Sequence, residues 1–239
     1  MNDTTRPRRE VGLITADPTP TLLGLLEVLG VDSIVVDAEQ TGITPTQCTD
    51  VVQRLAGTGV RVGVRVPELR DDCLLAFANT GVDELVLPRV RSTHDLETAY
   101  RATRFPPHGE RPRQVSRASR YGTEYAHVPM LSVLFETVDA VDAVETFAQH
   151  PLFVGGWIGP TDLFDDLQRH GRETELDARV QEVIDVVAAA GHPIGLPALS
   201  AARADEVHAR GASRSAIYWE REVTATLRAL VAARGTEAQ

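Results

Sequence analysis

The chain has 239 residues, of which 43% are hydrophobic, and a formal net charge of −10. This composition fits one large α/β domain better than two small ones. The negative charge argues against a general binder of nucleic-acid backbones, and no apolar run is long enough to cross a bilayer. Residues 1–10 are polar and arginine-rich without the apolar stretch of a secretory signal. We expect them to be a disordered segment of a cytoplasmic protein with no nucleic-acid or membrane partner.

The basic residues are all arginine, because the chain contains no lysine. This absence excludes Schiff-base aldolase chemistry and lysine-bound pyridoxal phosphate, which need an amine nucleophile. It also excludes a P-loop, whose lysine holds nucleotide phosphates. The two cysteines, Cys48 and Cys73, fall inside predicted helices without zinc-site or CxxC spacing, as expected for a reduced protein.

Short apolar runs bounded by glycine or proline alternate with helical segments along the chain. The predicted strands are 11–14, 33–37, 61–66, 85–87, 131–135, 153–158, 194–196 and 215–218. The predicted helices are 20–29, 44–57, 71–80, one that begins after Ser92, 138–150, 177–190, 200–210 and 220–234. Eight strand–helix units predict a single (β/α)8 TIM barrel over residues 11–235. A doubly wound open sheet is the alternative, but its glycine-rich fingerprint after the first strand is missing.

A long connection over residues 104–129 interrupts this alternation. It is rich in Pro, Gly, Ser and Arg, and the arginines after its first residue are Arg111, Arg113, Arg117 and Arg120. A connection of this length is usually functional or disordered. Two interpretations remain open, an anion-facing lid over the active site or a solvated loop at a subunit interface.

Two apolar runs end abruptly near a carboxylate, at Glu136 and at Asp162. A carboxylate at the end of a buried strand is costly unless a cation or hydrogen bonds compensate it. Two such ends in neighbouring strands would direct both carboxylates to one point, which suits Mg²⁺ or Mn²⁺. The alternative is that each carboxylate caps the helix that follows.

Asp37 and Arg65 likewise stand at the ends of the second and third predicted strands. The chemistry of a (β/α)8 barrel lies at the C-terminal ends of its strands. Arg65 in company with carboxylates is typical of a group that binds an anion or an oxyanion. We therefore include both residues in the candidate site.

Several motifs in order resemble those of the HpcH/HpaI aldolase/citrate lyase family, the metal-dependent pyruvate-type aldolases of the phosphoenolpyruvate/pyruvate barrel superfamily. The resemblance covers the chain from about Gly12 to Trp219. The motifs are Val35-Val36-Asp37-Ala38-Glu39, Val64-Arg65-Val66-Pro67, Phe105-Pro106-Pro107-His108-Gly109-Glu110-Arg111, Arg117-Ala118-Ser119-Arg120-Tyr121-Gly122, Phe135-Glu136-Thr137 and Ile158-Gly159-Pro160-Thr161-Asp162-Leu163.

The resemblance implies a role for each matching residue. Glu136 and Asp162 would ligate a divalent ion (Mg²⁺, Mn²⁺ or Co²⁺), which the carboxylate and 2-oxo oxygens of a pyruvate unit would also bind. The backbone N–H groups of Thr161 and Asp162 would hold the substrate carboxylate, with Gly159 of the same motif among the substrate-binding residues. Arg65 would stabilise the oxyanion of the enolate that the metal makes accessible.

Two positions depart from the family pattern. Gln40 stands where the family has the histidine that takes the hydroxyl proton in aldol cleavage, and Asn79 matches the aspartate that partners that histidine. Because an amide does not take up a proton near neutral pH, the pair suggests altered proton-transfer chemistry. Decarboxylation of an oxaloacetate-like acid, or a synthase that begins with it, needs no such base. Ordinary cleavage would need a metal-bound water or a histidine of the long connection, His108 or His127.

We therefore expect a class II, metal-dependent carbon–carbon lyase that acts on a small 2-oxo acid, a pyruvate or oxaloacetate unit. The alternative is a non-catalytic relative that binds a 2-oxo acid or serves as a structural subunit. The resemblance also implies a homo-oligomer, a trimer or a hexamer.

Overall fold

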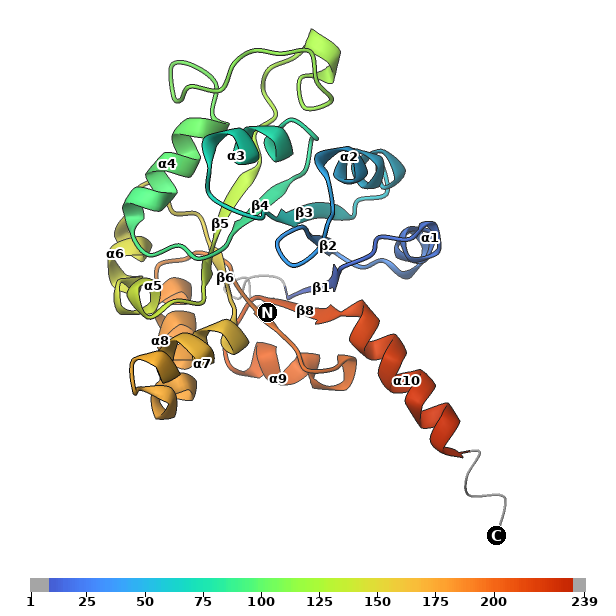
Figure 1. Ribbon diagram of the computed structural model, residues 1–239, viewed down its shortest axis with the longest axis vertical. Helices are drawn as coiled ribbons and strands as arrows, with labels where there is room; N and C mark the ends of the chain where they lie inside the picture. Colours follow the sequence, from blue (N-terminus) through green and yellow to red (C-terminus); the bar gives the residue numbers. More distant parts are fainter. Residues whose placement is uncertain (1–8, 234–239) are drawn as a thin grey trace, which may run out of the picture.

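Eight parallel strands close into a barrel in sequence order, from β1 to β8, with the helices outside them (Figure 1). The computed structural model describes residues 9–233. The strands are β1 Glu10–Thr15, β2 Ser33–Asp37, β3 Arg61–Arg65, β4 Glu84–Leu87, β5 Met130–Phe135, β6 Gly156–Ile158, β7 Ile194–Pro197 and β8 Arg214–Tyr218. Because β8 pairs with β1, the (β/α)8 barrel is confirmed and the open sheet is excluded.

The first strand begins at Glu10, one residue before the predicted start of the domain. The disordered segment predicted for residues 1–10 otherwise falls almost entirely outside the described residues. The predicted end of the domain, at residue 235, also lies outside them.

Ten α-helices are present in the described part of the chain, and none of them is long and apolar enough to cross a membrane. They are α1 Pro20–Leu29, α2 Pro45–Arg54, α3 Asp71–Ala78, α4 Thr93–Thr103, α5 Val138–Asp142, α6 Val144–Gln149, α7 Pro160–Arg169, α8 Leu176–Ala189, α9 Ala204–Ala209 and α10 Trp219–Ala233. Short 3-10 turns lie at Arg120–Gly122, Glu173–Glu175 and Ala201–Arg203.

Local signals explain where several helices begin and end. Thr44 and Gln47 form a reciprocal capping box at the start of α2, with Pro45 in the first turn. Gly30 ends α1 in the left-handed conformation, at φ 67°, which glycine adopts without steric cost.

Three helical regions of the structure differ from the prediction. The helix predicted over 138–150 is two helices, because the backbone leaves the helical region at Ala143. The helix predicted over 200–210 is a 3-10 turn followed by α9. Helix α7 was not predicted; Pro160 occupies its first turn, where a missing N–H group costs nothing.

The barrel interior has an apolar layer near its C-terminal end and a polar layer below it. The apolar layer consists of Ile14, Val35, Val86, Leu134, Trp157 and Ala216. In the polar layer, the buried Glu84 pairs with Arg214, and the indole Nε1 of Trp157 donates to Glu84 Oε1 at 3.0 Å. These bonds compensate the buried charges and fix the Trp157 ring under the mouth of the barrel.

The connection of residues 104–129 joins the end of α4 to the start of β5, and therefore returns to the N-terminal end of the barrel. Its Arg111 is fully buried and donates to the carbonyl groups of Ala78, Thr103 and His127. Burial and the charge of Arg104 lower the pKa of Arg111 to about 10. The connection therefore does not form an anion-facing lid over the active site of its own chain. It lies at the opposite end of the barrel, and the hydrogen bonds of Arg111 go to groups of the protein and not to a ligand.

Candidate active site

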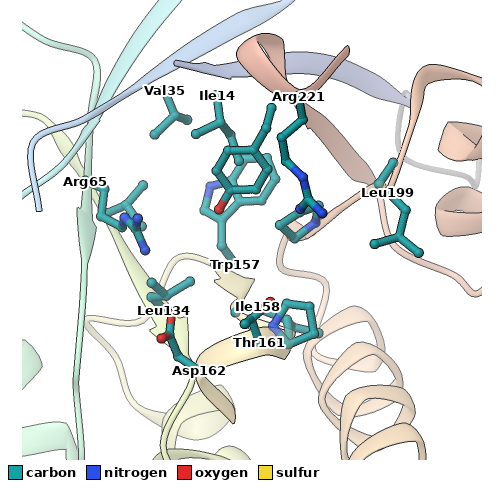
Figure 2. Close-up of a pocket in the computed structure, with 16 residues that line it drawn as sticks. Ile14, Val35, Arg65, Leu134, Trp157, Ile158, Thr161, Asp162, Leu199 and Arg221 are labelled. Atoms are coloured by element: carbon teal, nitrogen blue, oxygen red, sulfur yellow. The ribbon is translucent and has the colours of Figure 1, made fainter. Parts of the chain in front are cut away.

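A pocket lies at the C-terminal mouth of the barrel, where the strand ends and the loops after them meet (Figure 2). Active sites of (β/α)8 barrels lie at this end. Among the residues that line it are four of those predicted for the site, Arg65, Gly159, Thr161 and Asp162. The structure therefore brings together side chains from β3 and from the start of α7.

Arg65 is held in place by two carboxylates. Asp37 accepts from Arg65 Nε at 3.0 Å and from Nη2 at 2.7 Å, and Glu39 Oε2 lies 3.1 Å from Nη1. Burial lowers the pKa of Arg65, but the hydrogen bonds to Asp37 and the charges of Asp37 and Glu39 raise it more, so the guanidinium stays charged. Asp37 does not line the pocket, so it acts as a positioning residue for Arg65.

Glu136 carries the most unusual carboxylate of the site. It follows β5, is only 3% exposed and does not itself line the pocket, which it adjoins behind Gly159. Its Oε1 accepts from the backbone N–H of Arg89 at 2.6 Å, whereas its buried Oε2 has no hydrogen-bond partner. Burial raises the pKa of Glu136 to about 7, and the nearby charges of Glu39 and Asp162 add to the effect.

Asp162 lies in the first turn of α7 rather than at a strand end. Its side chain is exposed at the mouth, and its charge reaches both Glu136 and Glu39. The backbone N–H groups in the first turn of a helix lack intrahelical partners, so those of Thr161 and Asp162 are available to an anion. Asp162 lines the pocket but makes no capping hydrogen bond, because Gly159 is the N-cap of α7; only its charge in the first turn favours the helix dipole.

The predicted amide pair is not brought together within the chain. Gln40 lies after β2 at the mouth, with an exposed side chain. Asn79 caps the C-terminal end of α3, which is at the opposite end of the barrel. There its Oδ1 accepts from Arg111 Nε at 3.2 Å and from Nη2 at 2.9 Å. Within this chain, Asn79 positions the long connection rather than a substrate.

His127 is also far from the pocket of its own chain. Its Nε2 lies 2.9 Å from the carbonyl oxygen of Val82, just before β4, at the N-terminal end of the barrel. His108 belongs to the same connection. Neither of these two predicted substitutes for the missing base lines the pocket.

Four residues in or next to the pocket were not predicted as site residues from the sequence. Tyr218 ends β8 and lines the pocket, so the rule about strand ends would have found it. Trp157 was predicted to lie in a strand but not in the site. Glu39 belongs to the same family motif as Asp37, of which only Asp37 was predicted as a site residue. Arg221 belongs to a helix whose pattern is that of a surface helix, so no local signal marks it.

The residues present fit a divalent cation. No group of three or more His, Cys, Asp or Glu residues able to hold a metal exists among residues 9–233. The pair of Glu136 and Asp162 is nevertheless a donor set of the hard oxygen type that Mg²⁺ and Mn²⁺ prefer. The unpartnered oxygen Oε2 of Glu136 supports this fit, because a buried carboxylate oxygen without a donor is costly unless a cation compensates it. A cation beside Arg65 and a helix N-terminus would make the pocket a receptor for a small anionic ligand.

Comparison with known proteins gives the same result for fold and family. The hydroxypyruvate/pyruvate aldolase of Chromohalobacter salexigens is 30% identical over 192 residues, which cover 76% of this chain and 74% of that protein. A crystal structure of an HpcH/HpaI aldolase/citrate lyase family protein from Burkholderia cenocepacia has a TM-score of 0.84 at 23% identity, and the match covers 97% of this chain and 95% of that one.

The citrate lyase beta subunit of M. tuberculosis, solved with oxaloacetate and magnesium, has a TM-score of 0.57 at 17% identity, with 88% and 92% of the two chains covered. The sequence model of one family matches residues 11–220, which is most of the chain. The chain therefore belongs to the HpcH/HpaI aldolase/citrate lyase family.

Proposed function

We propose that this chain is a divalent-metal-dependent carbon–carbon lyase that acts on a small 2-oxo acid through a pyruvate-type enolate. The observation that carries the proposal is the buried, unpartnered Oε2 of Glu136, whose carboxylate is within electrostatic reach of both Asp162 and Arg65. The name of the Chromohalobacter relative, a hydroxypyruvate/pyruvate aldolase, supports the reaction class. The oxaloacetate and magnesium in the M. tuberculosis structure support the substrate class and the metal.

Each group of the chain has a distinct task in this proposal. Glu136 and Asp162 would hold the ion, which supplies Lewis acidity when bound. The N–H groups of Thr161 and Asp162, at the positive end of α7, bind the substrate carboxylate. Arg65 donates to the C2 oxygen as negative charge develops there. Because Asp37 and Glu39 already fix the guanidinium, this stabilisation needs no reorganisation during the reaction.

Decarboxylation is the second candidate within this class, and one observation favours it. In the described part of the chain, no histidine lines the pocket. Aldol cleavage requires a group that takes the proton of the 4-hydroxyl, and the exposed amide of Gln40 does not take up protons near neutral pH. Loss of CO₂ from a 3-carboxylated 2-oxo acid leaves the same enolate without such a base.

The test is pyruvate release from oxaloacetate and, separately, from a 4-hydroxy-2-oxo acid, with Mg²⁺, Mn²⁺ or Co²⁺ and after chelation. Glu136→Gln should abolish metal-dependent release, whereas Glu145→Gln, on the exposed surface of α6, should leave it unchanged. Turnover of oxaloacetate alone would identify a decarboxylase, and cleavage of the hydroxy acid an aldolase. Turnover that is unaffected by both chelation and Glu136→Gln would contradict the proposal, and no turnover of either acid would favour a non-catalytic 2-oxo-acid-binding protein.

We also propose that the protein is a homo-oligomer in which α10 packs on a second copy. Helix α10 extends away from its own barrel (Figure 1) and buries none of its residues. It exposes Leu227, Leu230 and Val231 on one face, while α1 exposes Val28 and Leu29. Exposed apolar faces of this kind are typical of surfaces that a second copy covers. Light scattering should therefore give a mass above 26.0 kDa, and Leu230→Glu should lower that mass.

A further inference from the structure

Two arginines line the pocket, and only one of them is neutralised. Arg65 is bonded to Asp37 and paired with Glu39. Arg221 forms no ion pair with any carboxylate among the described residues; its recorded contact is with the ring of Tyr218, 5.9 Å from Cζ to the ring centroid. Within residues 9–233, the pocket therefore contains one guanidinium that is not paired with a carboxylate.

Arg221 lies across the pocket from the groups assigned to the 2-oxo acid. Figure 2 shows Arg65 and Asp162 on one side of the pocket and Arg221 on the other, toward Leu199. The side chain descends from the start of α10 into the same space. A ligand held by its 2-oxo acid end beside Asp162 would extend toward Arg221.

The position of Arg221 is unfavourable for the helix itself. It lies in the first turn of α10, where the helix dipole opposes a positive charge. Glu220 and Glu222 of the same turn complement the dipole, but neither carboxylate forms an ion pair with Arg221 among the described residues, because both are directed to other donors. Glu220 accepts from Thr15 Oγ1 at 2.6 Å and from the N–H of Ala16 at 2.9 Å, and Glu222 accepts from the N–H of Ala201 at 3.2 Å. A ligand anion would satisfy both Arg221 and the helix N-terminus.

We infer that Arg221 is a specificity-determining residue that selects 2-oxo acids with a second carboxylate at the end remote from the 2-oxo group. This inference rests on the proposed function, because it takes the 2-oxo acid end to lie beside Asp162. The planar guanidinium suits a carboxylate, with which it forms two parallel hydrogen bonds. The apolar wall between the two ends, which includes Ile14 and Val35, accommodates the carbon chain of such an acid.

Binding of two acids of equal length tests the inference without any turnover. In the presence of Mg²⁺, calorimetry should show that the wild-type protein binds 2-oxoglutarate about 10- to 100-fold more tightly than 2-oxopentanoate. Arg221→Gln should remove this preference, and Arg221→Lys should restore part of it. Arg228→Gln, in the same helix and exposed, is the matched control and should keep it. A wild-type protein without the preference, or an Arg221→Gln protein that retains it, overturns the inference.

Turnover separates this inference from the function on which it rests. For 4-hydroxy-2-oxo acids that carry either a carboxylate or a methyl group on C4, Arg221→Gln should raise KM about 10-fold or more for the diacid and leave the methyl compound within about threefold. Equal losses with both substrates overturn a role in specificity. If the wild-type protein releases pyruvate from neither these acids nor oxaloacetate, the proposed function fails, and the binding preference still decides the role of Arg221.

Discussion

Gly159 lies so close to Glu136 that a Cβ at position 159 would come within 3.0 Å of both Cβ and Oε2 of the glutamate. The first residue after β6 is therefore a glycine at the point where the backbone passes the buried, unpartnered carboxylate oxygen. Any larger residue would displace that oxygen.

Gly159→Ala should therefore weaken the binding of a divalent cation about 10-fold or more while the fold is retained, because the methyl group moves Glu136 Oε2 away from Asp162. Calorimetric titration with Mn²⁺ measures this change. Gly42→Ala is the matched control, since a Cβ there meets no atom within 4 Å. Unchanged Mn²⁺ affinity in Gly159→Ala would show that Glu136 is not a ligand.

The stability of the metal-free protein should depend on pH through Glu136. Its pKa is raised from 4.5 to about 7 by burial, so between these pH values the folded state binds more protons than the unfolded state. Stability from this group is therefore present below pH 4.5 and declines as pH rises toward 7. In EDTA, Glu136→Gln should exceed the wild type in free energy of unfolding by roughly 3 kcal/mol at pH 8, and by little at pH 4.5.

Urea denaturation at several pH values measures that difference, with Glu145→Gln as the control. A difference between wild type and Glu136→Gln that is constant with pH would contradict the raised pKa. Saturating Mg²⁺ should reverse the order at pH 8, because only the wild type gains the binding free energy of the ion.

Arg111 should be essential for the structure of the connection over residues 104–129. Arg111→Gln leaves the carbonyl groups of Ala78 and His127 and the Oδ1 of Asn79 without their donor, which we expect to cost about 3 kcal/mol. Chymotrypsin should then cleave the connection faster at Tyr121 and Tyr125. Arg113→Gln, an exposed position of the same connection, should behave as the wild type. Equal cleavage of both variants would show that Arg111 does not hold the connection.

Gly195 should be required for the floor of the pocket. A Cβ at this position in β7 would lie 2.2 Å from Cε3 of Trp157, so the indole would have to leave Glu84. Gly195→Ala should destabilise the protein by about 1 to 3 kcal/mol and shift the tryptophan fluorescence. Gly24→Ala, where the nearest atom is the Nη2 of Arg54 at 3.8 Å, should be neutral or stabilising. Identical spectra and stability in the two variants would contradict this role of Gly195.

Much of the fold could be predicted because its signals are local. The apolar runs at 33–37 and 61–65, the capping box of Thr44 and Gln47 and the left-handed Gly30 each depend on residues a few positions apart. Helix α7 was not predicted, because the apolar run of residues 153–158 continues almost directly into Pro160. The sequence therefore does not mark the boundary between strand and helix.

The strand-end rule also predicted that Arg65 and Asp162 lie at one mouth, because the C-terminal ends of all strands of a parallel barrel are on the same side, and both residues line the pocket there. Asp162 reaches it from the first turn of α7 and not from a strand end. The strand-end rule did not distinguish Arg65, which lines the pocket, from Asp37, which only holds Arg65 in place. That distinction, between Arg65 and Asp37, depends on side-chain direction and on bonds between two strands.

The sequence by itself determined the barrel, the family resemblance and the acidic pair of Glu136 and Asp162, because periodicity, caps and motifs are properties of neighbouring residues. Only the tertiary structure decided which groups meet across long sequence separations. It pairs Asn79 with Arg111, which is 32 positions away in the sequence. Both of these residues lie at the opposite end of the barrel from Gln40. It also places Arg221 across the pocket from Arg65 without a carboxylate partner among residues 9–233. Burial and charge balance depend on the whole packed molecule, so the pKa of Glu136 and the pairing of Arg221 have no local signature.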